Sequence, residues 1–512
     1  MNIYIYVMTL VLLLLSEGTG AWFKRLLGID RSGFNAPVGF ALLLAGCQAL
    51  YYPAQIFNYS FHWIVVSTCI VLAAAVFFVI YDLADMKASL FRKETLIVLA
   101  AAVLFIVQCR GYEIVSIGDA GNTLPLQMSD VKAPQFQGYF HFALTFAWLV
   151  NLPLRLLHLP GVIYSAAEIY GLGMLYVVIS SMLIVDIVRR LGLRNHWFEF
   201  ALGIYLLMNG NYTAWWPGRA WLGLSWSVLF TTMAVYTGYR YLKDENEMHK
   251  YVWLPVITAG LACDNSFGLS GLAVLYGYMV FLFSIRKIRS LFDLFTFLIP
   301  LVVYSSAVLA SRWWPPLSWI IVIFYTWFSF RRYKKPIRRW ISRAEEFCFD
   351  HYKEMFLIGI PVLLVAASLV ISLTGGWDGI QSYHYYFSDF TEIDGMRDYL
   401  LIHSDWLQFA LNIFRWGGLC CLFWMAKEPC DRGVRVMLIT TLLVFLNPLA
   451  TPAIVSMTGP MFFHTFHVLF NPFTEAILFL FVYRMFQWTV IGQWVLEILL
   501  CLGALLGILG IG

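Results

Sequence analysis

Charge is the scarcest property of this chain. Only 12% of its 512 residues are Asp, Glu, Lys or Arg, whereas 61% are hydrophobic; a soluble domain averages roughly 25% charged residues. Crossing the hydrocarbon core of a membrane takes about 20 apolar residues, and the sequence divides into about 14 to 16 such stretches. The composition therefore excludes a large soluble domain and predicts one all-α, polytopic integral membrane protein.

Several motifs of catalytic and structural chemistry are missing as well. The sequence contains no GxxxxGK[ST] loop, no GxGxxG after a strand and no HExxH, so nucleotide-driven transport and zincin proteolysis lose support. The nine cysteines form no CxxC pair and lie mostly in apolar runs. We interpret them as small buried hydrophobes rather than as a metal site or a disulfide framework. The lack of a convincing inverted repeat weakens a secondary-transporter interpretation.

The first apolar run lacks the basic residues that precede the core of a signal peptide. Its positive charges follow it, at Lys24 and Arg25. We therefore expect an uncleaved first span.

The positive charges that are present fall unevenly on the two sides of the predicted membrane. When the turns between apolar stretches are assigned alternately to two sides, all but seven of the 34 Lys and Arg lie on one side. Cytoplasmic loops hold an excess of Lys and Arg, so this side is predicted to be cytoplasmic and the first residue to lie outside. We attribute the net charge of +4 to this bias, and expect no nucleic-acid partner. The seven exceptions are Arg110, Lys132, Arg155, Arg219, Arg312, Arg397 and Arg415.

The predicted organisation has three parts. Residues 1–110 form the N-terminal transmembrane helices, 111–160 an outer loop with an interfacial helical segment, and 161–512 the remaining helices with outer loops 375–404 and 457–471. Within the third part, polar residues and glycines interrupt two spans at 263–271. Irregular backbone at membrane depth is tolerated where protein or water satisfies it.

Two acids lie in the first outer loop, just before the segment that returns to the membrane. They are Asp119 and Asp130. A carboxylate there could act as a general base toward an incoming hydroxyl, or bind a cation. The alternative is a loop Asp that caps a short helix.

Two histidines in the third outer turn, His464 and His467, are three residues apart, so a helix would place both on one face. Imidazole suits metal binding or contact with phosphate oxygens. Interfacial histidines with solvated tips are the alternative. A zinc site would need a third ligand, such as His384 or Asp119.

Three further charged residues are candidates for substrate binding. Arg219 follows a Trp-rich turn, and Arg415 falls inside a predicted span, where a charge usually faces a polar cavity. Arg415 could neutralise a lipid phosphate; alternatively it snorkels or pairs with an acid. Asp264 lies at the break between two spans.

Three sequence segments resemble the polytopic glycosyltransferases of the GT-C architecture, close to poorly characterised bacterial multi-pass membrane proteins of that layout. The segments are Ile117-Gly-Asp-Ala-Gly-Asn-Thr-Leu-Pro125, Trp216-Pro-Gly-Arg-Ala-Trp-Leu-Gly223, and Leu446-Asn-Pro-Leu-Ala-Thr-Pro452 running into Thr458–His467. The chain departs from the pattern where Gly121 and Asn122 follow the first acid, and where His464 stands near the position expected for an Arg. The acidic loop also follows the fourth span rather than the first.

The resemblance implies an inverting glycosyltransferase of the bacterial plasma membrane. Such enzymes move a sugar from a polyprenyl-phosphate carrier to a cell-envelope acceptor on the outer face. Asp119 would be the general base and Asp130 the second choice. Arg219 and Arg415 would hold the lipid phosphate, with His464, His467 and Asp264 near the substrate. No cofactor is certain, although a divalent cation is compatible.

Two other functions stay open. A lipid-linked glycan transporter or flippase would use buried charges such as Asp264, Glu168 and Arg415 along a pathway. A non-catalytic membrane subunit would scaffold a polysaccharide synthesis complex and associate with other membrane proteins.

Overall fold

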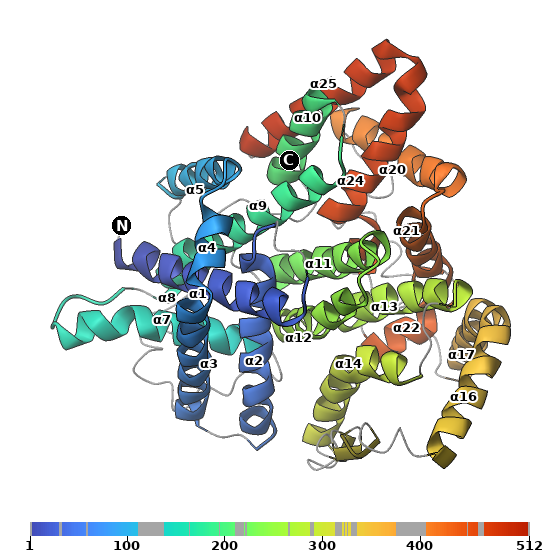
Figure 1. The fold of residues 1–512 in the computed structure, drawn as a ribbon, viewed down its shortest axis with the longest axis horizontal. Coiled ribbons are helices and arrows are strands. Elements are labelled where there is room, and N and C mark those ends of the chain that lie inside the picture. The colour runs from blue at the N-terminus through green and yellow to red at the C-terminus, as the bar shows by residue number, and fades with distance from the viewer. Residues whose placement is uncertain are drawn as a thin grey trace.

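The computed structural model of the chain is an array of helices joined by turns and irregular segments. It describes residues 3–29, 33–57, 60–110, 138–162, 164–193, 195–209, 220, 223–264, 267–286, 291–312, 320–321, 323–324, 326–328, 335–374, 406–447, 449–458 and 465–509. Within these ranges there is no strand (Figure 1). The predicted all-α class is confirmed.

The helices vary in length, and several are interrupted by π-helical or 3-10 turns. In chain order they are α1 (Ile3–Leu26), α2 (Ala36–Phe57), α3 (Phe61–Tyr81), α4 (Leu83–Leu90), α5 (Thr95–Cys109), α7 (Gly138–Leu156), α8 (Tyr164–Ala166), the π-helical η2 (Ala167–Leu172), α9 (Gly173–Arg190), α10 (His196–Asn209), α11 (Gly223–Lys243), the 3-10 helix η3 (Glu247–Val252), α12 (Trp253–Cys263), α13 (Phe267–Ser284), α14 (Leu291–Arg312), α16 (Lys335–Asp350), the π-helical η4 (Lys353–Gly359), α17 (Ile360–Thr374), α20 (Trp406–Met425), α21 (Pro429–Thr440), the π-helical η6 (Thr441–Phe445), α22 (Thr451–Thr458), α23 (Phe466–Leu469), α24 (Pro472–Met485), the 3-10 helix η8 (Phe486–Trp488) and α25 (Val490–Leu509).

Six helices of the described chain are long and apolar enough to cross a membrane. They are Ile3–Leu26, Ala36–Phe57, Phe61–Tyr81, Tyr164–Arg190, Phe267–Ser284 and Lys353–Thr374. Shorter apolar helices account for further predicted stretches: Thr95–Cys109, His196–Met208, Thr296–Ser306, Phe409–Met425 and Val490–Leu505. The chain is therefore an all-α protein with several candidate membrane spans, and the expected total of about 14 to 16 stays a prediction.

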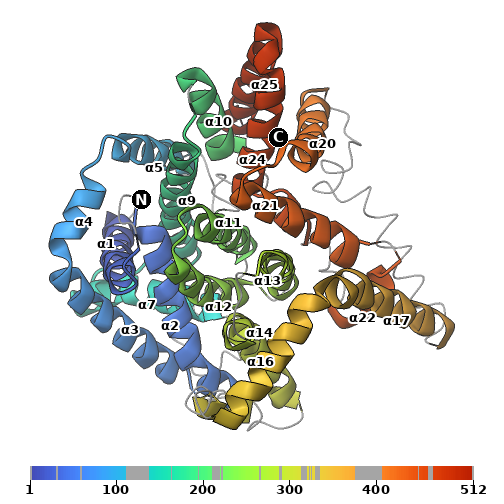
Figure 2. The same cartoon turned by 45° about the vertical axis from the view of Figure 1, so that its right-hand side comes forward.

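Burial separates the central spans from the peripheral ones. In the apolar 18-residue window of Tyr164–Arg190, 89% of the residues are buried, and in that of Phe267–Ser284 78% are. The corresponding shares are 22% for Phe61–Tyr81 and 6% for Lys353–Thr374. A helix that is apolar on all sides must be surrounded by protein or by lipid. In Figures 1 and 2, α11, α12 and α13 lie in the middle, α1, α2 and α3 on one side and α20, α24 and α25 on the other.

Small residues allow α1 and α2 to touch through their backbones. A Cβ atom at Gly39 would collide with the carbonyl oxygen of Ser16, and one at Gly20 with the carbonyl oxygen of Asn35. Close approach of this kind favours van der Waals packing between membrane helices. Glu17, on the same part of α1, accepts hydrogen bonds from the backbone N–H groups of Asn35 and Ala36 and so satisfies the first turn of α2.

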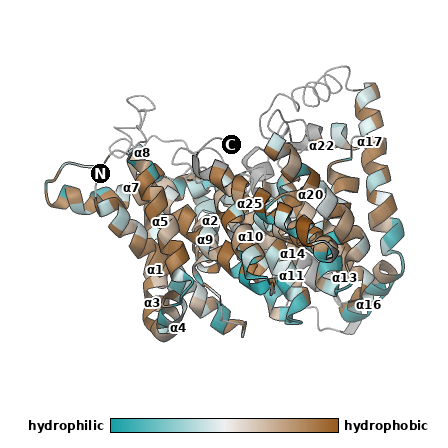
Figure 3. Cartoon of the chain, turned by 90° about the horizontal axis from the view of Figure 1, so that it is seen from above, coloured by the Kyte–Doolittle hydropathy of each residue, from teal (hydrophilic) through white to brown (hydrophobic). Residues whose placement is uncertain are grey.

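The basic ends of several helices gather at one end of the bundle. Arg25 lies 2.6 Å from Asp82, Arg189 lies 2.8 Å from Glu94, and the ammonium of Lys243 donates to the carbonyl oxygen of Arg190. Hydrophilic residues line this edge in Figure 3, at α4, α11, α13 and α16. We call this region the basic face; it includes Lys24, Arg25, Arg189, Arg190, Arg240, Lys243, Arg286 and Arg484. Its existence supports the predicted division of the turns between two sides.

Helix α16 is amphipathic and lies at the basic face. It packs through Ile341 and through Phe349, which contacts Phe283 of α13. Its other apolar side chains, Trp340 and Phe347, are 63% and 55% exposed. Figure 2 looks nearly down α13 and α14, whereas α16 lies across the view.

Candidate functional site

Four of the predicted site residues lie outside the described part of the chain. They are Asp119, Asp130, Arg219 and His464. Their predicted roles therefore stay predictions. Arg415, His467 and Asp264 are described.

Arg415 is buried in the bundle between α10, α20 and α24. It is 1% exposed, and its Nε lies 3.2 Å from Oε1 of Glu475, which is fully buried. Its guanidinium also donates hydrogen bonds to Asn412 and to the hydroxyl of Tyr205. The alternative of pairing with an acid is the arrangement that the structure shows. A lipid phosphate would have to compete with Glu475 for this guanidinium.

His467 lies in the short helix α23 and is 3% exposed, so its side chain is not a solvated interfacial tip. Its carbonyl oxygen accepts a hydrogen bond from the side chain of Asn471, which also caps the first turn of α24 in a capping box with Thr474. The residue is therefore built into the turn that starts α24.

Asp264 ends α12 in an extended conformation, and α13 begins three residues later at Phe267. A break between two helices is present where the sequence predicted one, and it is shorter than 263–271. Gly223, at the start of α11, packs against the carbonyl oxygen of Cys263. The carboxylate of Asp264 lies within electrostatic reach of Tyr304 in α14.

A buried carboxylate near this break, Glu168, was predicted for the alternative transport pathway but not for the transferase site. Glu168 is 6% exposed and lies in the π-helical turn η2, where its Oε1 accepts a hydrogen bond from the hydroxyl of Tyr164 at 2.5 Å. π-Helical turns inside helices are often found at functional sites. The Tyr–x–x–x–Glu spacing inside an apolar stretch was the available sequence signal, but the π-helical turn was not visible in it.

Glu168 and the α12–α13 break belong to one cluster of aromatic and polar side chains. Tyr139, in the first turn of α7, lies within electrostatic reach of both Glu168 and Cys263. Its ring centroid is 5.9 Å from that of Trp226 in α11. We call Glu168, Tyr139, Tyr164, Cys263 and Trp226 the carboxylate cluster. A carboxylate held by a single phenol can accept or release a proton during a reaction.

Helix α7, which follows the predicted acids in the sequence, packs beside the cluster. Helix α7 begins at Gly138, directly after residues 111–137, and it packs against η2 and α12. Tyr139 therefore follows the acidic loop in the sequence and lies near Glu168 in the fold. Helix α7 accounts for the helical segment that we expected within 111–160.

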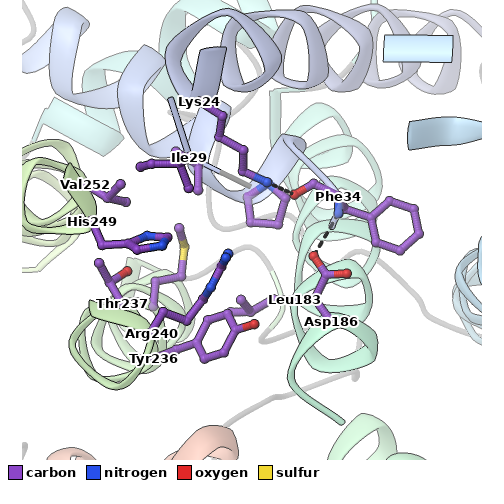
Figure 4. Close-up of a pocket in the computed structure, with 13 residues that line it drawn as sticks. Lys24, Ile29, Phe34, Leu183, Asp186, Tyr236, Thr237, Arg240, His249 and Val252 are labelled. Carbon is purple, nitrogen blue, oxygen red and sulfur yellow. Dashed lines mark hydrogen bonds between the residues drawn. The ribbon is translucent and has the colours of Figure 1, made fainter. Parts of the chain in front are cut away.

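A second polar site lies at the basic face, in a cavity of about 40 Å³ between α1, α2, α9, α11 and η3 (Figure 4). Lys24 Nζ donates to the carbonyl oxygen of Phe34 at 2.7 Å, and the N–H of Phe34 donates to Oδ2 of Asp186 at 2.7 Å. The side chains of Arg240 and His249 point toward Lys24 across the cavity.

Arg240 and His249 are both anchored by Asp244. The guanidinium of Arg240 donates twice to Oδ2 of Asp244, and His249 Nε2 lies 3.2 Å from the same oxygen. Burial alone would raise the pKa of Asp244, but its interactions with His249 and Arg240 outweigh burial and lower the pKa to about 2. Burial lowers the pKa of His249 despite its contact with Asp244, so its ring is neutral at pH 7.

An apolar groove of about 740 Å³ runs between α5, α9 and α10. The ion pair between Glu94 and Arg189 lies at one end, next to His196 and Glu199. Its size is within the range of ligand pockets, and its lining is predominantly apolar. A groove of this kind suits a hydrocarbon chain.

All nine cysteines are described and free. Within the described ranges, no three His, Cys, Asp or Glu side chains gather as metal ligands would. His384, another possible zinc ligand, also lies outside those ranges.

No family model, no curated protein and no solved structure matches the chain.

Proposed function

We propose that the protein is a membrane glycosyltransferase that transfers a sugar from a polyprenyl-phosphate carrier to a cell-envelope acceptor on the outer face of a bacterial plasma membrane. The observation that carries the proposal is the position of Glu168. This buried carboxylate lies beside Tyr139, which follows directly on the loop that bears Asp119 and Asp130. The resemblance of three sequence segments to GT-C enzymes gives the reaction class.

The reaction requires a base for the acceptor and stabilisation of the leaving phosphate. Asp119 is proposed to take the proton from the acceptor hydroxyl as the bond to the anomeric carbon forms. The carrier phosphate leaves as an anion, so it needs cationic contacts more than a proton, and Arg219 is the candidate for that contact. Glu168 supplies the second acid that the sequence lacks directly after Asp119.

The test is sugar transfer by the full-length protein in proteoliposomes supplied with polyprenyl-phosphate sugars. Asp119→Asn should lower the rate about 100-fold or more, because general bases contribute roughly 10²–10⁴-fold. Glu247→Gln, which neutralises an exposed acid at the basic face, is the matched control and should retain the wild-type rate. Both variants should match the wild type in unfolding temperature.

Full activity in a folded Asp119→Asn protein would remove this residue from the reaction. A cysteine placed at position 119 that reacts with an impermeant thiol reagent only from the cytoplasmic side would exclude the outer-face mechanism altogether.

A lipid-linked glycan flippase is the second candidate, and the buried pair of Arg415 and Glu475 favours it. Charged residues inside a span often mark a transport pathway. Movement of a lipid-linked glycan across vesicles without formation of glycosidic bonds would support this function instead. A non-catalytic scaffold would show neither activity and would copurify with other subunits.

A further inference from the structure

Lys24 is a buried cation whose charge is not directly paired. Lys24 is 4% exposed. Within the described chain, its ammonium donates one hydrogen bond, to the backbone oxygen of Phe34, and forms no ion pair. An ammonium has three donors. A buried charge normally has a counter-ion and a full set of hydrogen bonds, because removing it from water is costly.

A second donor in the same cavity also has no partner. Tyr236 is 8% exposed, lines the cavity, and its hydroxyl has no hydrogen-bond partner among the described residues. Figure 4 shows the Tyr236 hydroxyl, the Arg240 guanidinium and the Lys24 ammonium around one space. Buried polar groups without a partner are rare and indicate an absent water, ion or ligand.

Among the described residues that line the cavity, Lys24 and Arg240 are cations and Asp186 is the only carboxylate. The N–H of Phe34 occupies one oxygen of Asp186.

The size of the cavity restricts what can bind. At about 40 Å³ it has room for on the order of three water molecules. It therefore has no room for a sugar or a nucleobase, but it can hold the oxygens of one phosphate group whose remainder extends toward the basic face.

We propose that this cavity binds a phosphate group, with Lys24 and Arg240 as its cationic contacts and Tyr236 donating a hydrogen bond to a phosphate oxygen. Arginine and lysine are the usual phosphate ligands in proteins. The group belongs either to a phospholipid headgroup or to a small soluble phosphate ester. The site is separate from the carboxylate cluster, so it goes beyond the transferase function proposed above and does not depend on it.

The experiment uses full-length protein purified in phosphate-free detergent solution. The unfolding temperature is measured against increasing sodium phosphate in one arm and against phosphatidylglycerol in mixed micelles in the other. A ligand that binds only the folded state raises the unfolding temperature with its concentration. Stabilisation in the first arm identifies a soluble source, and stabilisation in the second alone identifies a lipid source.

Tyr236→Phe removes only the hydroxyl and should weaken binding of the active ligand about tenfold, equivalent to about 1.4 kcal/mol. Tyr176→Phe is the matched control, because Tyr176 also has a buried hydroxyl with no partner among the described residues but does not line the cavity. It should leave the binding constant unchanged. Lys24→Met should abolish binding. If this variant does not fold, the difference in binding constant between Tyr236→Phe and Tyr176→Phe still tests the proposal.

Two results would overturn the proposal. One is the absence of stabilisation in both arms, which would mean that water alone fills the cavity. The other is an equal effect of Tyr236→Phe and Tyr176→Phe on the binding constant.

Discussion

The pair of Arg415 and Glu475 shows how a charged residue is accommodated inside this bundle. The sequence predicts Arg415 within a span and leaves pairing with an acid open. Glu475 is 60 positions away in the sequence, and such a distance in the chain gives no signal that the two side chains meet. Both side chains are almost completely buried, and each supplies a counter-charge to the other.

Glu475→Gln should therefore lower the free energy of unfolding by about 3–5 kcal/mol, because it removes the buried carboxylate that lies against the Arg415 guanidinium. The measurement is equilibrium denaturant unfolding in detergent. The double variant Arg415→Met, Glu475→Gln should recover part of the loss. Asp350→Asn breaks the exposed ion pair with Arg286 and, as the control, should change stability by less than about 1 kcal/mol. An equal loss of stability in Glu475→Gln and Asp350→Asn would contradict this account.

Asp431 makes stability depend on pH in the opposite direction from a surface acid. It lies at the start of α21, before the apolar part of that helix, and burial raises its pKa from 3.8 to about 6 despite the attraction of Arg484. Between pH 3.8 and about pH 6, Asp431 therefore keeps a proton in the folded protein that it has already lost in the unfolded chain. The stability contributed by this proton is complete below pH 3.8 and is lost as the pH rises to about 6.

Asp431→Asn should remove this pH dependence. Its unfolding temperature should exceed that of the wild type at pH 7.5, and the difference should disappear below about pH 4. Thermal unfolding in detergent from pH 4 to pH 8 provides the measurement. A variant less stable than the wild type at pH 7.5 would mean that the contact with Arg484 outweighs burial.

At the scale of single elements, α1 and α2 depend on glycine at their crossing. Gly39→Ala should lower the free energy of unfolding by about 1–3 kcal/mol or more, because the new methyl group meets the backbone of Ser16, which cannot rotate away. Gly203→Ala in α10 is the control, since nothing lies within 4 Å of its Cβ position. It should be neutral or slightly stabilising through helix propensity. Denaturant unfolding that gave the two variants equal stability would show that the crossing can relax.

The elements could be predicted where apolar runs are long and polar breaks are clear. The polar residues from Asp264 onward correctly predicted that two spans are interrupted. The predicted span over 434–456, however, is divided into α21, η6 and α22. Between η6 and α22, the side chain of Asn447 accepts a hydrogen bond from the N–H of Leu449. The high hydropathy of this stretch concealed that break, and no sequence pattern indicated the π-helical turns.

For the whole molecule, the distribution of Lys and Arg predicted which helix ends would lie together, because charged ends must reach water on the same side. The cavity that contains Lys24 could not be predicted in this way. Its lining comes from the ends of α1, α9 and α11, the start of α2 and the turn η3. Only their packing brings Lys24, Tyr236 and Arg240 to one space.

The candidate span Lys353–Thr374, which comprises η4 and α17, has little protein around it. Only 6% of the residues in its apolar 18-residue window are buried. Its 22 residues extend roughly 33 Å at 1.5 Å per residue, slightly more than the hydrocarbon thickness of about 30 Å. A span longer than its bilayer relieves the mismatch by tilting. We therefore expect lipid chain length to set the tilt of this candidate span, and, through the connection at His351 and Tyr352, the depth of the aromatic side chains of α16 in the membrane.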